Sequence, residues 1–180
     1  MIKLVRDFYV SGDDDVVFET LQKYLPEYLG SHPEDEYNVV EEMTDDSHIL
    51  YRKSILKRVS FLKELPNMVQ KTLPPEFVES VSHLTEESVF DKKNKKINFF
   101  IVSGDIYHLK GTTKFIPITK EKCKVVTVLY FTLLDAEKHF PNKTVSSVLM
   151  PFLRNKIPER FITNQNLYYN EVLRKYKLKP

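Results

Sequence analysis

A chain of 180 residues, 42% hydrophobic and 29% charged, is large enough for one globular domain whose core needs no covalent staple. Its 27 basic and 25 acidic residues give a formal charge of only +2, so no general field of one sign favours nucleic acid as a partner. Because Cys123 is the only cysteine, an internal disulfide framework and an all-cysteine zinc site are excluded.

The first predicted elements are a strand and a helix. Residues 3–10 are rich in β-branched and aromatic side chains and are followed by a turn signal. Apolar residues then recur at helical spacing after Asp13, Asp14 and Asp15, and Gly30 ends that pattern. We expect this acidic triplet to cap the helix rather than to bind a metal, because calcium needs more ligands at spaced positions.

The next segment predicts a hairpin and a short helix. Residues 37–44 and 48–59 form two strand-like runs joined by a turn signal. In the loop that follows, a short helix is expected to start at Pro66 and to stop at the pair Pro74 and Pro75.

The second half predicts strands followed by a long helix. Residues 77–135 alternate β-rich runs with turn signals, which indicates four consecutive antiparallel strands. One of these turns, Lys92 to Lys96, is expected to be solvated or to touch anionic lipid at about 1 kcal/mol per charge. Beyond Pro141 the pattern becomes helical, with a kink expected at Pro158.

This order of elements predicts an α+β fold of the helix-grip, or START-like, class. In that fold a curled antiparallel sheet of about six to seven strands packs on a long C-terminal helix. We expect residues 1–180 to form one such domain. Where the sheet and the helix do not fill the space between them, an apolar cavity remains, which is the usual form of a small-molecule site. Such a cavity suits a lipid, because each acyl methylene moved into water costs about 0.8 kcal/mol.

Nothing in the sequence predicts export or a membrane span. The N-terminal residues are interrupted by charges, so they lack the continuous apolar region of a signal peptide. No run of about 18 apolar residues occurs. We therefore expect a soluble, cytoplasmic chain unless a family resemblance indicates an organelle.

Four segments resemble, in order and spacing, the PRELI/MSF1 family of mitochondrial intermembrane-space phospholipid transfer proteins. The segments are QKYLPEYLGSH, LYRKSILKR, KELPNMVQKTL and LTEESVFDKKNKKI. The resemblance runs from Phe8 to about Asp105, with a weaker echo in the C-terminal helix. It implies transfer of an anionic phospholipid such as phosphatidic acid or phosphatidylserine, transient contact with a membrane surface, and a small twin-cysteine helical-hairpin protein as partner.

The same resemblance implies a basic headgroup site. Lys23 matches a basic residue near the phosphate, while Arg58 and Lys63 match basic positions before the short helix. Arg58 is the preferred contact, because its planar fork can engage two phosphate oxygens. His32 and Lys156 complete the set. For each residue the alternative interpretation is an ordinary solvated side chain.

The short helix matches the lid of the family. Its apolar residues would lie over the cavity or enter lipid, and the alternative is simple core packing of a short helix. The lid residues are Leu65, Met68, Val69 and Leu73.

Catalysis receives little support from the sequence. His83, Glu86, Glu87 and Ser88 lie close together on one predicted strand, but alternation divides them between two faces and no Gly-x-Ser-x-Gly elbow occurs. Cys123 is expected to be a small core or edge residue. No metal spacing, P-loop or dinucleotide fingerprint appears, so we expect no cofactor. The prediction is a protein that is not an enzyme.

Two alternatives to phospholipid transfer remain open. One is an enzyme of the same architecture, a cyclase or hydrolase acting on a hydrophobic ligand. Carboxylates or histidines facing into the cavity with perturbed pKa values would favour it. The other is a protein-interaction module whose filled core leaves no cavity.

Overall fold

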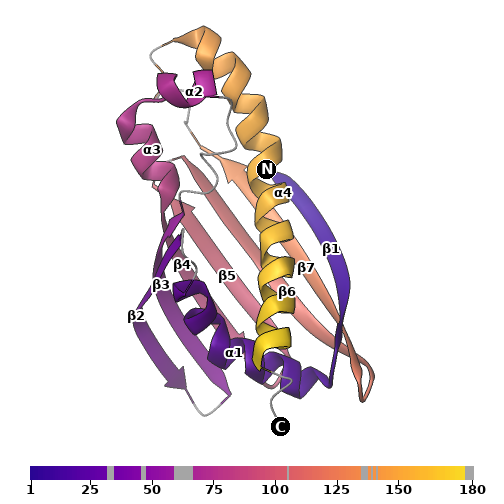
Figure 1. The fold of residues 1–180 in the computed structure, drawn as a ribbon. Helices are drawn as coiled ribbons and strands as arrows, with labels where there is room; N and C mark the ends of the chain where they lie inside the picture. Colours follow the sequence, from indigo (N-terminus) through magenta and orange to yellow (C-terminus); the bar gives the residue numbers. More distant parts are fainter. Residues whose placement is uncertain are drawn as a thin grey trace.

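The computed structural model describes residues 1–31, 35–45, 48–58, 67–104, 106–134, 138, 140 and 142–176, apart from the side chains at 35, 58, 68, 69 and 72. Seven antiparallel strands form one sheet in the order β1-β7-β6-β5-β4-β3-β2. Figure 1 shows this sheet curled around the long helix α4, with α1 across one end and α2 and α3 near the other. The predicted helix-grip fold is confirmed.

The elements follow one another along the chain in an order that matches the predicted one, with an additional helix before β4. They are β1 (Ile2–Ser11), α1 (Asp14–Gly30), β2 (Asp35–Asp45), β3 (Ile49–Arg58), α2 (Asn67–Thr72), α3 (Pro75–Ser82), β4 (His83–Asp91), β5 (Lys96–Ser103), β6 (Tyr107–Thr119), β7 (Lys122–Leu133) and α4 (Lys143–Tyr176).

Strand β1 pairs with a strand that is distant from it in the sequence. It pairs antiparallel with β7 over its whole length, from Ile2 opposite Phe131 to Ser11 opposite Lys122. Because side chains alternate between the two faces of a strand, the even-numbered residues of β1 share the concave face. Leu4 contributes to the core there. Among the described residues, β1 is an edge strand that pairs with β7 and with no other strand.

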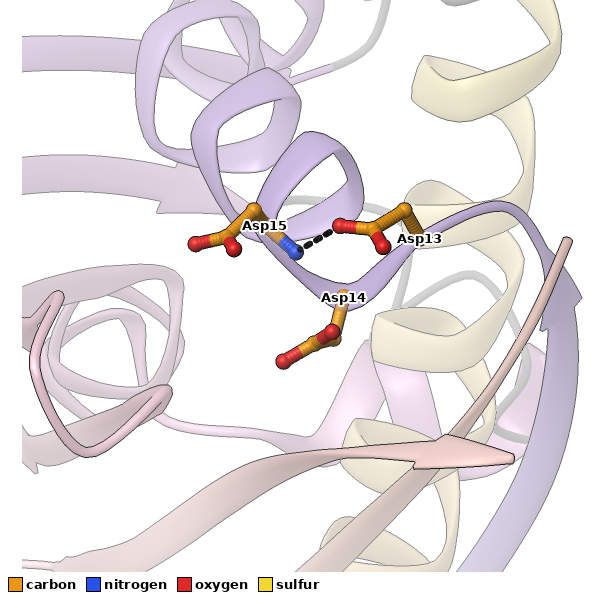
Figure 2. Close-up of side chains that lie close together, drawn as sticks. All are labelled: Asp13, Asp14 and Asp15. Atoms are coloured by element: carbon orange, nitrogen blue, oxygen red, sulfur yellow. Dashed lines mark hydrogen bonds between the residues drawn. The ribbon is translucent and has the colours of Figure 1, made fainter. Parts of the chain in front are cut away.

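The acidic triplet before α1 is a helix cap, as the sequence predicted. Asp13 is extended, with φ −60° and ψ 142°, and its carboxylate accepts a hydrogen bond of 3.0 Å from the N–H of Asp15 (Figure 2). Asp14 and Asp15 place two further carboxylates in the first turn, where they complement the helix dipole. Asp15 also pairs with Lys95 of the β4–β5 turn.

The lysine-rich β4–β5 turn is tied to the protein itself. Lys92 pairs with Glu19 of α1 at 2.6 Å, and Lys96 pairs with Asp91 at 3.4 Å. The Lys92–Glu19 and Lys95–Asp15 pairs fasten α1 to one end of the sheet, while the Lys96–Asp91 pair joins β5 to β4. Three of the turn's lysines are therefore engaged by carboxylates rather than directed at lipid.

The short helix ends where the sequence predicted, because α2 stops at Thr72, just before Pro74 and Pro75. The sequence did not predict that a further helix begins directly after it. Pro75 is the first residue of α3, and Pro74 precedes it in the extended conformation, with φ −60° and ψ 138°. Proline suits this position because its fixed φ matches the helix and the N–H that it lacks would have no intrahelical acceptor. Phe77 and Val81 are buried in α3, so the strand expected from residue 77 begins only at His83.

Helix α4 spans 34 residues and continues through Pro151 and Pro158. The sequence predicted a kink at Pro158. The first turn of α4 is capped by Asn142, whose side-chain oxygen accepts a hydrogen bond of 2.8 Å from the N–H of Thr144. Within the described residues, no helix is long and apolar enough to cross a membrane.

Two apolar clusters fill the space between the sheet and the helices. The larger one joins α3, the middle strands and the first half of α4, and it includes Phe77, Phe99 and Leu153. The smaller one lies between α1, the other ends of the strands and the last turns of α4, and it includes Phe18 and Tyr169. Buried Cys123 belongs to this second cluster, as a core residue should.

Candidate functional site

A pocket lies between α1, α4 and strands β4 and β5, where the two apolar clusters meet. Its walls are mostly apolar and aromatic, and its open volume is about 40 Å³, enough for about three water molecules. The main apolar wall residues are Leu25, Leu29, Phe90, Phe99, Phe161 and Tyr168. We call this the Glu86 pocket, after the one carboxylate among its lining residues.

Glu86 and Ser88 reach the pocket because they are two residues apart on β4. The alternation of the strand places them on the same inner face as the buried residues Leu84 and Phe90. The hydroxyl of Ser88 donates a hydrogen bond of 2.6 Å to Oε1 of Glu86. The pocket therefore holds an oriented carboxylate against apolar walls.

Tyr169 of α4 faces the same pocket through a chain of polar contacts. The amide of Gln165 donates a hydrogen bond of 3.2 Å to the Tyr169 oxygen, and its own carbonyl accepts one of 3.3 Å from Thr127. Burial, followed by the negative charge of Glu86, raises the pKa of the Tyr169 phenol well above its usual range. The phenol therefore stays protonated at neutral pH and can donate a hydrogen bond.

A buried arginine holds α1 against the strands beside this pocket. Arg52 is only 4% exposed and donates hydrogen bonds of 2.7 Å to the Glu42 carboxylate and 2.9 Å to the Gln22 carbonyl oxygen. Its guanidinium also lies 4.9 Å from the centre of the Phe90 ring. Because its charge is compensated on every side, Arg52 positions α1 rather than offering an empty anion site.

A second, larger hollow lies on the other side of α4, between that helix and β1. Its volume is about 390 Å³, and its lining includes Arg6, Lys156 and Arg160 together with the carboxylate of Glu159. Lys156 pairs with Glu159 at 3.3 Å. We call this hollow the basic groove.

Of the predicted headgroup residues, the structure describes the side chains of Lys23 and Lys156 only, and these two lie apart. Lys23 is exposed on α1, with its ammonium 4.8 Å from the ring centre of its neighbour Tyr24, and it lines neither hollow. Lys156 lines the basic groove instead of the Glu86 pocket. Arg58 is the last residue of β3, and its side chain is outside the description. His32 and Lys63 lie outside the described residues.

Of the four predicted lid residues, the structure describes the side chain of Leu73 only. Leu73 is 8% exposed and packs in the larger core cluster, so it is a core residue. Met68 and Val69 belong to α2, but their side chains are outside the description, and Leu65 lies outside the described residues.

Sequence reasoning missed the pairing of Glu86 with Ser88. It treated both as part of a group divided between two faces, which is correct for Glu87, since that residue pairs with Lys53 at 3.8 Å away from the pocket. The sequence signal that could have identified the site is the two-residue spacing of Leu84, Glu86 and Ser88. This spacing places a carboxylate within a row of inward-facing residues. A group of this kind is a candidate functional residue.

Comparison with known proteins supports the fold. No family model and no curated protein matches the chain. Among solved structures, a protein of Thermus thermophilus superposes with a TM-score of 0.63 at 18% identity, covering 97% of this chain and 99% of its own. The Zhui aromatase/cyclase from Streptomyces sp. R1128 gives 0.62 at 16% identity, covering 97% and 94%.

Norcoclaurine synthase from Thalictrum flavum also superposes, with a TM-score of 0.56 at 13% identity, over 99% of this chain and 87% of its own. At these identities the likeness shows a shared helix-grip fold and nothing further. It nevertheless overturns the prediction that the chain is not an enzyme. That prediction rested on the absence of a recognised catalytic motif, whereas two proteins that share the fold over 94% and 87% of their own length are named as enzymes.

Proposed function

We propose that this protein binds a ring-bearing, mostly apolar small molecule in the Glu86 pocket. The observation that carries the proposal is an oriented carboxylate, Glu86, set among aromatic and aliphatic walls. Burial of a ring against Phe99 and Phe161 supplies the binding free energy, while the polar groups fix its orientation. A ligand hydroxyl donates to Glu86, and a ligand carbonyl accepts from Tyr169.

Binding requires α1 and α4 to separate, because 40 Å³ is well below the roughly 300–1,000 Å³ of small-molecule sites. The two helices are held together at the protein surface by Tyr24 stacked on Tyr176 at 4.3 Å, with the rings 6° apart. Tyr176 also donates a hydrogen bond of 2.8 Å to Glu27, and Tyr28 donates one to Glu171. We call these contacts the α1–α4 clasp. Water can replace its hydrogen bonds when the helices part.

Acid–base catalysis on the same ligand is the second candidate, and the joint presence of Glu86 and Tyr169 favours it. The Glu86 carboxylate would take a proton from a carbon next to a ligand carbonyl, and the electron pair would move to the carbonyl oxygen. Tyr169, kept protonated by its surroundings, would donate a hydrogen bond to the oxygen on which negative charge develops. The names of two structural neighbours, a cyclase and a synthase, agree with this class of chemistry.

Phospholipid transfer, with the partner and compartment that the PRELI/MSF1 resemblance implies, is a finer and more demanding hypothesis. Two acyl chains need a space many times larger than the open volume of the Glu86 pocket. A lipid would therefore have to displace α1 from the concave face entirely, breaking the Arg52 contacts as well as the clasp.

Binding is tested by titrating the purified protein with 2-naphthol, a hydroxylated double ring, and following the heat of binding. We expect Glu86→Gln to weaken binding by on the order of tenfold or more, because the hydroxyl loses its charged acceptor. The matched control is Glu87→Gln, one residue away on the other face of β4, which should bind like the native protein. Unchanged affinity in Glu86→Gln contradicts the proposal. A two-chain phospholipid in native mass spectra supports transfer instead.

Catalysis is tested with 2-tetralone, a bicyclic ketone, in deuterated water. If Glu86 is the base, the native protein speeds exchange of the hydrogens next to the carbonyl, as followed by proton NMR. Glu86→Gln should lose this acceleration, while Glu87→Gln should keep it. Equal exchange rates with and without protein would rule out this ketone as a substrate of a Glu86 base.

A further inference from the structure

We propose that the basic groove is a second binding site, for a small organic anion in which a phosphate monoester or carboxylate is attached to an apolar group. The groove and the Glu86 pocket have no lining residue in common, and they lie on opposite sides of α4. The proposal therefore stands apart from the function proposed for that pocket.

On the sheet side, the cation comes from Arg6 of β1. Strand alternation places Arg6 on the same concave face as Leu4 and Phe8, both of which pack against the core. The Arg6 side chain, in this row at the sheet edge, is exposed and lines the groove. One of its N–H groups donates to the Val5 carbonyl oxygen at 3.2 Å, and an arginine has five such donors.

On the helix side, the cations come from Lys156 and Arg160 of α4. Residues four apart lie on the same face of a helix, so both side chains reach the same hollow. The carboxylate of Glu159 offsets one of the charges through its contact with Lys156. Among the lining residues, three cations and one carboxylate give a net positive formal charge, which favours an anion.

The remaining lining explains why the ligand should carry an apolar group. Phe152 and Ile162 contribute carbon surface to the groove, and Thr163 and Asn164 contribute neutral polar side chains. Its volume of about 390 Å³ lies within the usual range for small-molecule sites. The planar guanidinium of Arg6 favours a planar or tetrahedral oxyanion, which it can bind in a bidentate manner.

The site is tested by NMR with 15N-labelled full-length protein titrated with phenyl phosphate, inorganic phosphate and phenol. Phenyl phosphate should shift the amide signals of Arg6, Lys156, Arg160 and Thr163 and leave that of Glu86 in place. Inorganic phosphate should shift the same signals at higher concentration, and phenol should leave them unchanged. Shifts centred on the Glu86 pocket, or none that saturate, overturn the proposal.

Charge-reversing variants distinguish a specific binding site from general electrostatic attraction between the protein and the anion. Arg6→Glu and Lys156→Glu should each raise the dissociation constant for phenyl phosphate on the order of tenfold or more. The matched controls are Lys3→Glu, on the outer face of β1 beside Tyr130, and Arg154→Glu, exposed on α4 outside the groove. Equal losses in the variants and their controls overturn the proposal. All four residues are at least partly exposed, so the fold should persist, as the spectra will show.

A further titration identifies the source of the anion. Lysophosphatidic acid below its micelle-forming concentration offers the same phosphate on a single acyl chain. Tighter binding of this probe than of phenyl phosphate, at the same amide signals, indicates a lipid headgroup. Tighter binding of phenyl phosphate indicates a small aromatic phosphate. Failure of both probes overturns the proposal while leaving the Glu86 pocket untouched.

Discussion

The phenol of Tyr169 illustrates how surroundings set the chemistry of a single residue. Its raised pKa predicts a pH-dependent stability. Above pH 10.0, the ordinary value for tyrosine, the unfolded chain releases this proton while the folded protein keeps it, so stability falls as pH rises. The loss is at most about 1.4 kcal/mol per pH unit from this group. Urea denaturation at pH 8 and pH 11 should show a smaller fall for Tyr169→Phe than for the native protein; equal falls contradict the assignment.

Gly111 of β6 lies where no side chain fits. A Cβ atom there would approach the Phe99 ring and the carbonyl oxygen of Val128 to 2.5 Å. We expect Gly111→Ala to lower the free energy of unfolding by about 1–3 kcal/mol, since the backbone atom cannot turn aside. The control is Gly30→Ala, whose nearest neighbour would be the Tyr37 oxygen at an acceptable 3.4 Å. Comparable thermal unfolding of both variants would show that β6 and β7 relax freely.

Single residues of the site were only partly predictable from the sequence. The spacing of Glu86 and Ser88 fixes a common face, yet which face looks inward depends on the sheet's curl and on α4. Tyr169 and Gln165 lie on a helix that joins β4 only in three dimensions, so no local pattern relates them to Glu86. Arg52 resembles any charged strand residue until α1 covers it.

At the scale of elements, the start of α1 gives a direct measure of capping. Asp13 accepts the N–H of Asp15, whereas Asp14 acts chiefly through the helix dipole. We expect Asp13→Ala to cost about 1 kcal/mol of stability and Asp14→Ala about half as much. Chemical denaturation of the two variants compares these values, and an equal cost would mean that charge, not the cap, stabilises the helix.

The α1–α4 clasp predicts how easily the Glu86 pocket opens. Removing the ring in Tyr176→Ala deletes the stacking on Tyr24 and the hydrogen bond to Glu27, contacts of about 1–2 kcal/mol together. Hydrogen exchange should accelerate in the last two turns of α1 and of α4, and 2-naphthol should bind faster. Arg174→Ala, an exposed change in the same turn, is the control. Unaltered exchange would show that the contacts of Tyr176 do not limit the opening of the Glu86 pocket.

Elements were predictable where one physical signal dominates. Alternating apolar residues indicated the strands, because each has one buried face, and the three aspartates indicated the start of α1. Pro74 and Pro75 indicated the end of α2, but the start of α3 at Pro75 was missed, because proline is disfavoured inside a helix and yet suits its first position. Pro151 and Pro158 both lie inside α4, which continues through them. Their roles depend on the buried neighbours of each helix, which a local window does not contain.

At the scale of the whole molecule, the helix-grip class followed from the order of elements, but the division of its concave face did not. Helix α4 separates an apolar pocket from a basic groove, and the sequence contains no signal for that separation. The predicted headgroup site therefore combined Lys23 and Lys156, which lie on different elements and do not share a hollow. A resemblance in sequence does not by itself place residues close together in the structure.

Strand β1 covers one edge of β7, and this pairing predicts the effect of removing β1. Deleting residues 1–11 leaves β7 with a long unpaired edge and exposes the core beside Val125. We expect the shortened protein to self-associate and to unfold at a lower temperature. Light scattering coupled to size-exclusion chromatography measures the first effect, and a monomer of native stability would contradict the expectation.

The pairing of β1 with β7 also constrains how the protein is made. Strand β1 leaves the ribosome long before its only strand partner has been synthesised. At translation speeds of 5–20 residues per second, the wait between Ser11 and Leu133 is roughly 6 to 24 s. During that interval the nascent chain carries a solitary strand with an apolar side, a natural target for a chaperone working near the tunnel exit.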